Sequence, residues 1–278
     1  MEYTKENPLR VVTLFSGYDS QCLALNRLKK QFPMFDYELV AWCEFDPESK
    51  AAIEKQPAVV AHNALFPQWA DRNLGDITKV DEYDVPDCDL ITYSFPCTDI
   101  SQAGRQEGLT AGSGTRSSLA WEAIRIFKAK RPKFLLMENV PNLVSQKFIR
   151  DFYDINYTLE KIGYANYPHL LNAKHYGVAQ NRERIFLVSI RIDDENNIPM
   201  FHFPKPFKLK KRLKDYLEDD VPEEYYLSDE RLSEFFEKPN GDATISQHQW
   251  GIVNNKDKEV IGALCHCDYK EPPKVLEK

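Results

Sequence analysis

The stretch DLITYSFPCTDISQAG, residues 89–104, decides how the rest of the chain can be interpreted. It opens with the apolar run Leu90–Tyr93, which has the length and composition of a buried strand. Pro96 lacks an amide hydrogen and disfavours helix in the residue before it, so the strand is predicted to end there. Cys97 should therefore lie at the carboxyl end of a strand, where open α/β sheets place their chemistry. Taken alone, such a cysteine is more often a small buried apolar residue, and only its neighbours favour a catalytic role.

The composition narrows the class of protein. A chain of 278 residues can bury a substantial core, as one large domain or as a core with an appendage. No apolar run approaches the roughly 18 residues that span a bilayer, and the polar start MEYTKENPLR fits no targeting signal, so no membrane partner is expected. Six cysteines are no disulfide framework at this length and favour a reducing cytoplasm. The net charge of −7 excludes a uniformly basic surface but allows a local basic face.

Strands and helices alternate along the first two thirds of the chain. Strands are predicted at residues 9–15, 38–43, 90–93 and 133–137, and a possible antiparallel pair at residues 165–172 and 184–192. Helices are predicted at residues 21–30, 117–130 and 145–162, and one more is expected to begin at Pro47. This alternation favours an α/β fold, a mostly parallel sheet with helices on both faces. The boundary is predicted near residue 192, with residues 1–192 as the catalytic domain and residues 193–278 as an irregular remainder.

Polar residues follow the first two predicted strands in a pattern typical of nucleotide sites. Phe15-Ser16-Gly17 forms a glycine-containing turn before a helix, and Glu44 ends the next strand, where an acid can hold ribose hydroxyls. The turn reads FSGYDS and lacks the G-x-G-x-x-G that seats a pyrophosphate. A cofactor with a ribose but no phosphate fits better, and S-adenosylmethionine is the obvious one. Glu44 could also be only a solvated carboxylate after a strand.

A second acid lies at the tip of a predicted strand. Glu138 follows the apolar FLLM, so it would lie near Cys97 if the two strands are neighbours. A thiol and a carboxylate in one cleft suggest nucleophilic attack with acid assistance on an electron-poor ring or carbonyl. An unperturbed thiol has a pKa of about 8.5, so a catalytic Cys97 needs a nearby positive group. Arg182 and Arg184 are candidates, although taken alone they are better explained as surface charges that pair with Glu183 and its neighbours.

Six short blocks occur in order along the chain, and together they resemble the C5-cytosine DNA methyltransferases, especially bacterial and phage members. They are FSG at 15–17, Glu44, Asp76, PCxxxS at 96–101, ENV at 138–140 and QxRxR at 180–184. The resemblance covers about residues 9–192, and residues 203–228 are similar to the stretch that follows in many members. It implies the Rossmann-like fold of S-adenosylmethionine-dependent methyltransferases, and a bacterial or phage-infected cell.

The resemblance also implies a role for each matched residue. Cys97 would attack C6 of a flipped-out cytosine in double-stranded DNA, and C5 would take the methyl group and leave S-adenosylhomocysteine. Glu138 would hold N3 and the exocyclic amine, Arg184 would contact O2, and Arg182 would brace Glu138. Residues 98–116 would form a loop over the base. The implied cofactor residues are Phe15, Ser16, Gly17, Glu44, Phe45, Asp76, Pro96 and Leu119, and the implied DNA or loop residues are Ser101, Arg116 and Gln180.

The chain departs from the family in two places. The first turn has Tyr18-Asp19-Ser20 where members often have further glycines, and no match to the last two family blocks occurs before Lys278. The expectation is therefore a shortened chain, a degenerate copy, or one half of a split enzyme completed by a second chain. Two other functions stay open: a tRNA cytosine-C5 methyltransferase, and a non-catalytic DNA-binding subunit with the same fold. Restriction-modification is the expected setting for the DNA enzyme.

Two further segments carry possible binding chemistry. Residues 203–214 hold six basic residues and no acid, which fits either a phosphate-contacting edge or a solvated linker. Cys265-His266-Cys267 has two thiols too close for the usual zinc spacing and no matching second pair, so no metal is predicted.

Overall fold

The computed structural model describes residues 3–97, 116–218, 220, 222 and 261–262. The chain divides into two compact units, residues 1–170 with 184–203, and residues 171–183 with 204–278. The predictions for Ser101, for most of the 98–116 loop and for Cys265 to Cys267 lie outside the described residues. The domain boundary near residue 192 stays a prediction.

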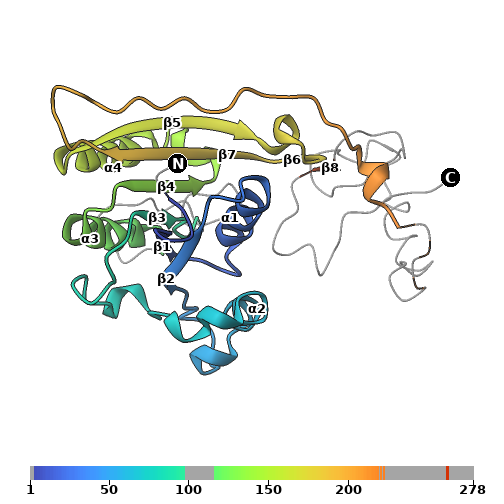
Figure 1. The fold of residues 1–278 in the computed structure, drawn as a ribbon, viewed down its shortest axis with the longest axis horizontal. Helices are drawn as coiled ribbons and strands as arrows, with labels where there is room; N and C mark the ends of the chain where they lie inside the picture. The colour runs from blue at the N-terminus through green and yellow to red at the C-terminus, as the bar shows by residue number, and fades with distance from the viewer. Residues whose placement is uncertain (1–2, 98–115, 219, 221, 223–260, 263–278) are drawn as a thin grey trace, which may run out of the picture. The chain divides into compact units, whose positions relative to one another are not determined.

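A six-stranded sheet forms the centre of the first unit, in the order β2-β1-β3-β4-β7-β5, which Figure 1 shows from bottom to top. Its strands are β1 Leu9–Leu14, β2 Tyr37–Cys43, β3 Leu90–Tyr93, β4 Phe134–Asn139, β5 Tyr164–Asn172 and β7 Glu183–Arg191. The strands from β2 to β4 pair in parallel, and β7 runs antiparallel to β4. This confirms the predicted α/β fold with a mostly parallel sheet.

Helices cover both faces of this sheet because side chains alternate between the faces along each strand. Val11 and Leu39 pack on one face against Cys22 and Leu25 of α1 (Ser20–Gln31) and Val59 of α2 (Pro57–Leu65). On the other face, alternate residues of β1, β3 and β4 pack against α3 (Ala120–Lys130) and α4 (Ile149–Lys161). The core is therefore two apolar layers on either side of the sheet.

The predicted helix that begins at Pro47 is wrong. Residues 44–52 form turns and bends, and α2 begins ten residues later, at Pro57. The side chain of Gln56 holds the segment open, because its Oε1 accepts from the Asp46 amide at 2.8 Å and its Nε2 donates to the Asp46 carbonyl at 3.2 Å. Proline suits the first turn of a helix at either position, and this tertiary contact decides between them.

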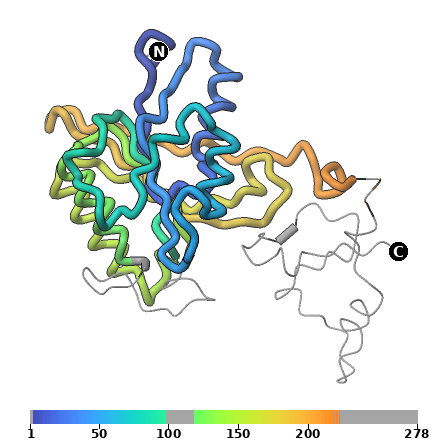
Figure 2. Tube along the Cα trace, turned by 90° about the horizontal axis from the view of Figure 1, so that it is seen from below, coloured from blue at the N-terminus to red at the C-terminus, as the bar shows by residue number. Residues whose placement is uncertain are grey.

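After α2 the chain passes beside the end of β2, where Asn73 forms a parallel bridge with Trp42; Figure 2 colours this part of the chain from blue to cyan. A 3-10 helix, Pro67–Arg72, follows α2, and the Leu74 amide donates to the Trp42 carbonyl at 2.7 Å. A second 3-10 helix, Ile77–Lys79, begins directly after Asp76. Because the Cys43 thiol donates to the Gly75 carbonyl at 2.9 Å, this helical turn sets Asp76 beside the end of β2.

The other predicted elements differ only at their ends. The Ser117 and Ser145 helices begin with 3-10 turns or bends, so the regular helices start at Ala120 and Ile149. The strand predicted at residues 133–137 continues to Asn139, because its antiparallel pairing with β7 extends past Met137.

The second unit is described in part. Its described elements are the 3-10 helix Ala173–Tyr176, β6 (Gln180–Asn181), the 3-10 helix Leu213–Tyr216 and β8 (Ile261–Gly262), and β6 pairs in parallel with β8. The Phe207 amide donates to the His175 carbonyl at 2.9 Å, and the Tyr176 hydroxyl donates to the Pro204 carbonyl at 3.0 Å. These bonds fasten the start of the basic segment 203–214 to the first 3-10 helix.

Candidate active site

The strand register aligns four loops at one edge of the sheet. Leu14 pairs with both Cys43 and Tyr93, and Tyr93 pairs with Met137. These paired residues of the parallel strands therefore lie in one row, and the residues that follow them are Phe15, Glu44, Ser94 and, still within β4, Glu138. Residues predicted to act together thus leave the sheet at the same edge, where α/β folds bind their ligands.

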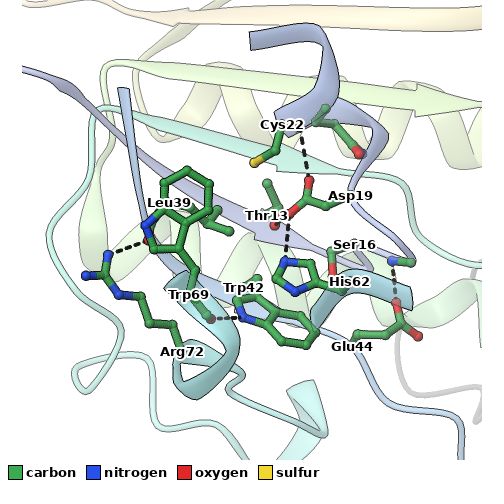
Figure 3. Close-up of polar contacts among 12 residues, drawn as sticks. Thr13, Ser16, Asp19, Cys22, Leu39, Trp42, Glu44, His62, Trp69 and Arg72 are labelled. Carbon is green, nitrogen blue, oxygen red and sulfur yellow. Dashed lines mark hydrogen bonds and ion pairs between the residues drawn. The ribbon is translucent and has the colours of Figure 1, made fainter. Parts of the chain in front are cut away.

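The first turn is built from left-handed backbone. Phe15 and Gly17 both have φ 57°, and Asp19 has φ 66°. A Cβ atom on Gly17 would meet nothing within 4 Å, so the backbone conformation and not crowding favours glycine here. This turn directs the Gly17 amide to Glu44, whose Oε2 accepts its hydrogen bond at 2.7 Å. Figure 3 labels Glu44 and marks this bond with a dashed line.

Two carboxylates face the same pocket from separate loops. The Glu44 backbone is held by Asn73, whose Oδ1 accepts from the Glu44 amide at 3.1 Å. Asp76 caps its 3-10 helix, since its Oδ1 accepts from the amide and the hydroxyl of Thr78 at 3.1 and 2.8 Å. Both acids are thereby fixed by backbone contacts before any ligand binds.

These loops enclose a pocket of about 420 Å³. Seven of the eight predicted cofactor residues line it, namely Phe15, Gly17, Glu44, Phe45, Asp76, Pro96 and Leu119. The eighth, Ser16, is 5% exposed and lies behind the turn, where its amide donates to the Cys43 carbonyl at 3.2 Å. The sequence reasoning missed six lining residues, Cys43, Pro47, Gly75, Ile77, Thr78 and Ser94. Most adjoin predicted ones, and this adjacency is the signal that could have found them.

The lining chemistry suits an adenosine group with a positive charge. Apolar side chains from Phe15, Phe45 and Leu119 offer surface to a purine, and Glu44 and Asp76 can accept from hydroxyl and amine groups. Among the described residues, no Lys or Arg lines the pocket, which disfavours a phosphate ligand. Burial raises the pKa of the Cys43 thiol to about 12, helped by the charges of Glu44 and Asp76, so this cysteine stays neutral.

Cys97 differs from the other cysteines that the structure describes. Cys22, Cys43 and Cys88 are buried, whereas Cys97 is partly exposed at the pocket edge of the sheet. Burial also raises the pKa of the Cys88 thiol to about 12. Among the described cysteines, Cys97 is therefore the one that a substrate can reach.

A buried amide joins the Cys97 loop to the end of β4. Asn139 is 3% exposed, and its Nδ2 donates to the Phe95 carbonyl at 3.1 Å. Its Oδ1 accepts from the Val140 amide at 2.8 Å. The Asn139 side chain thus ties the Phe95 backbone, two residues before Cys97, to the end of β4, directly after Glu138.

Glu138 forms an ion pair with Arg184 of β7, with 3.0 Å between Oε1 and Nε. The sequence assigned this bracing contact to Arg182 and gave Arg184 to the base. Arg182 belongs to the second unit, where its amide donates to the Gln180 carbonyl at 3.0 Å. Gln180 starts β6, and Arg116 begins the 3-10 helix Arg116–Leu119. The structure therefore brings Glu138 and Arg184 together by direct contact.

Among the described residues, no group of three or more His, Cys, Asp or Glu side chains could hold a metal ion. None of the helices described has the length and apolar character needed to cross a bilayer.

Known proteins resemble this chain in sequence and in fold. It is 46% identical over 164 residues to the type II methyltransferase M2.ScrFI of Lactococcus lactis subsp. cremoris, over 59% of this chain and 44% of that protein. It is 32% identical over 276 residues to M1.ScrFI of the same bacterium, over 99% of this chain and 65% of that protein. The chain spans about half the length of the curated relatives it matches.

Solved structures agree on the fold. The structure of S. pombe Dnmt2 methyltransferase matches with a TM-score of 0.64 at 19% identity, over 95% of this chain and 72% of that one. The sequence model of the family described as C-5 cytosine-specific DNA methylase matches residues 9–268. The site agrees with this match, since the pocket of about 420 Å³ and the accessible Cys97 thiol lie at the same edge of the sheet. The chain belongs to the C-5 cytosine-specific DNA methylase family.

Proposed function

We propose that this chain methylates C5 of cytosine in duplex DNA with S-adenosylmethionine as methyl donor, in a restriction-modification setting. The observation that carries the proposal is the alignment of Phe15, Glu44, Ser94 and Glu138 at one sheet edge, with Cys97 accessible beside them. Type II methyltransferases among its relatives favour DNA over the tRNA alternative. A non-catalytic role makes no demand for Cys97, Glu138 and the Arg184 ion pair together. A DNA substrate and cysteines that form no disulfides fit a location in the cytoplasm of a bacterium, or of a bacterium infected by a phage.

In the proposed reaction, Cys97 adds electrons to the cytosine ring at C6, and Glu138 stabilises the charge that this addition builds on the ring. The Cys97 thiolate forms a bond to C6, and the electron pair of the C5–C6 double bond moves toward C5. Glu138 holds N3 and shares a proton with it as charge builds on the ring, while Arg184 keeps the carboxylate in position. After methylation, loss of the C5 proton restores the double bond and expels the Cys97 sulfur. S-adenosylmethionine, when bound, supplies a methyl group on a positive sulfur.

The donor would be held by the chain's own pocket residues. The Glu44 Oε2 accepts from the Gly17 amide, and a carboxylate can accept further hydrogen bonds, here from a ribose hydroxyl. Asp76 faces the same space and can accept from an adenine amine, and Phe45 offers a flat apolar surface. The described lining holds two acids and no Lys or Arg, a charge balance that favours a ligand with positive charge, and the Lys79 ammonium 3.5 Å from Asp76 offsets part of that charge.

Replacing Glu44 with Gln should weaken S-adenosylmethionine binding by about 10-fold to 100-fold, because a hydrogen bond to a charged group contributes about 1.5–3 kcal/mol. Isothermal titration calorimetry of the chain measures this change directly. Glu54→Gln is the matched control, since Glu54 is an exposed acid outside the pocket lining. Equal affinities for the wild type and Glu44→Gln would remove Glu44 from the cofactor site.

The second unit supplies a groove suited to DNA phosphates. Its volume is about 860 Å³, and its described lining holds four basic side chains and no acid, namely Lys174, His175, Lys208 and Arg212 with Pro206, Phe207 and Leu209. The backbone bond between Phe207 and His175 brings residues 174–175 next to the basic segment 203–214. A cluster of this charge is notable in a chain whose net charge is −7, and it supports the phosphate-contacting interpretation of residues 203–214.

The double substitution Lys174→Gln and Lys208→Gln should weaken binding to duplexes of every sequence and lower the slope of log K against log salt by about 2. Each lysine that contacts a phosphate releases about one counterion on binding. Fluorescence anisotropy across a salt series measures the slope. Arg27→Gln with Lys30→Gln is the control, since both lie exposed on α1. An unchanged slope in the groove variant would assign the basic segment to a solvated linker.

Transfer of labelled methyl groups tests the proposed function. The chain is incubated with tritiated S-adenosylmethionine and either duplex DNA of mixed sequence or tRNA. Label in 5-methylcytosine of the duplex is expected, and label only in tRNA would favour the RNA enzyme. The same assay with an added candidate second chain tests the split-enzyme prediction. Binding without transfer under all conditions would favour a non-catalytic subunit.

A further inference from the structure

We propose that His62 is a positioning residue for the cofactor pocket, which acts by holding Asp19 and thereby the turn that presents Gly17 to Glu44. The inference rests on the proposed function, because it names how this chain shapes the S-adenosylmethionine site. It concerns a buried cluster behind the pocket, formed by Thr13, Asp19, Trp42 and His62, which Figure 3 shows. None of these four side chains lines the pocket itself.

Asp19 occupies an unfavourable position for its residue type. Its φ of 66° and ψ of 60° are left-handed, a conformation that disfavours residues with a Cβ atom. Its side chain is also fully buried, with 0% exposure, and a buried carboxylate needs polar partners to offset its lost hydration. A glycine in this position would carry neither the strain nor the buried charge. Asp19 therefore depends on its surroundings to a degree that glycine would not.

Three groups surround the Asp19 carboxylate. The Thr13 hydroxyl donates to Oδ2 at 2.8 Å, and the Cys22 amide donates to Oδ1 at 3.4 Å as the cap of α1. The fully buried His62 Nε2 faces Oδ2 at 3.6 Å, which is ion-pair distance and longer than a hydrogen bond, and this nitrogen has no hydrogen-bond partner among the described residues. The threonine and the amide come from elements next to Asp19 in the chain, whereas His62 comes from α2 and is the tertiary partner.

The His62 ring also contacts β2, the strand that leads to Glu44. It stacks on Trp42 with 3.6 Å between ring centroids and 17° between planes, and Phe66 lies tilted at 5.3 Å. The Trp42 indole is held in turn by the Trp69 carbonyl, which accepts from Nε1 at 2.8 Å. Trp42 comes two residues before Glu44, and Asp19 comes two residues after Gly17. A single imidazole thus touches both chain segments that meet in the 2.7 Å bond between the Gly17 amide and Glu44.

Loss of the imidazole should disturb the turn more than the fold. Without its tertiary partner, the buried Asp19 carboxylate gains by moving toward water, and the left-handed turn has less to hold it. The Gly17 amide would then leave Glu44, and the carboxylate would lose its orientation toward the ribose. A simpler alternative is that His62 only fills space between Trp42 and Phe66.

The test compares variants that separate polar pairing from packing. His62→Phe keeps an aromatic ring but removes the polar contact, while His62→Gln keeps a donor for Asp19. We expect His62→Phe to raise the Kd for S-adenosylhomocysteine at least 10-fold by calorimetry, and His62→Gln to stay within about 3-fold of wild type. Val59→Ala, at a buried position on the same helix, controls for lost packing and should lower the melting temperature without changing the Kd.

A second background tests the link through Asp19. Glycine relieves both the left-handed strain and the buried charge, so in Asp19→Gly the further change His62→Phe should alter the Kd less than 3-fold. Equal effects of His62→Phe in both backgrounds would mean that His62 acts by packing alone, and the inference would fall.

Hydrogen–deuterium exchange of the unliganded chain gives a readout that needs no ligand. In His62→Phe, the amides of residues 16–22 should exchange at least 10-fold faster, while those of α4 remain unchanged. If wild-type chain fails to bind S-adenosylhomocysteine, the proposed function is wrong, and the exchange result still decides whether His62 holds the turn. Unchanged exchange at residues 16–22 would overturn the positioning role.

Discussion

Cys97→Ser is expected to abolish the covalent complex between this chain and DNA that carries 5-fluorocytosine, and to lower methyl transfer on the order of 10³-fold or more. A hydroxyl at this position ionises far less readily than a thiol, so addition to C6 becomes the limiting barrier. Fluorine at C5 cannot leave as a proton does, so the wild-type chain stays bonded to C6 through its sulfur. Mass spectrometry of the wild-type mixture, with S-adenosylmethionine present, should find the mass of chain plus methylated oligonucleotide.

The control for this experiment is Cys88→Ser, which changes a buried cysteine that the structure keeps from solvent. It should retain the adduct. Cys97→Ser should bind S-adenosylhomocysteine and DNA within about 3-fold of the wild type, because Cys97 contributes to the chemical step and not to affinity. An adduct that persists in Cys97→Ser would assign the nucleophile to another residue.

Glu138→Gln should lower kcat by about 10²–10⁴-fold, the range for a positioned acid or base, with little change in cofactor affinity. The amide oxygen can still accept from the Arg184 Nε now 3.0 Å from the carboxylate, so the side chain should keep its place. What it loses is the ability to share a proton with N3 as charge builds on the ring. Single-turnover transfer of tritiated methyl groups separates this loss from product release.

Glu160→Gln provides the matched control, because Glu160 is an exposed acid on α4. It should leave kcat within about 2-fold of the wild type. A Glu138→Gln variant with normal kcat and a raised KM for DNA would show instead that Glu138 contributes only to base binding.

Local sequence was enough to predict most of the elements around the site. Apolar runs broken by glycine, proline or acids mark the ends of β1, β2, β3 and β4, and their polar successors include Glu44, Cys97 and Glu138. Strand and helix periodicities depend on neighbouring residues, so they can be read without knowing the tertiary partners. The six ordered blocks then pointed to the family.

Features that depend on distant contacts could not be predicted in this way. Pro47 and Pro57 are equally suited to start a helix, and the Gln56 bonds to Asp46 decide for the second. The pairing of Glu138 with Arg184 follows from the antiparallel register of β4 and β7. The contact between His62 and Asp19 carried no signal in the chain.

The sequence by itself determined that this chain has an α/β fold and belongs to the C-5 cytosine-specific DNA methylase family, with its polar and reactive side chains at strand ends. The tertiary structure alone decided which of those groups meet: the row of four strand ends, the Gly17–Glu44 bond and the buried histidine behind it. The physical reason is that periodicity and turn chemistry are local, whereas strand register and buried polar pairs are chosen by packing of the whole sheet.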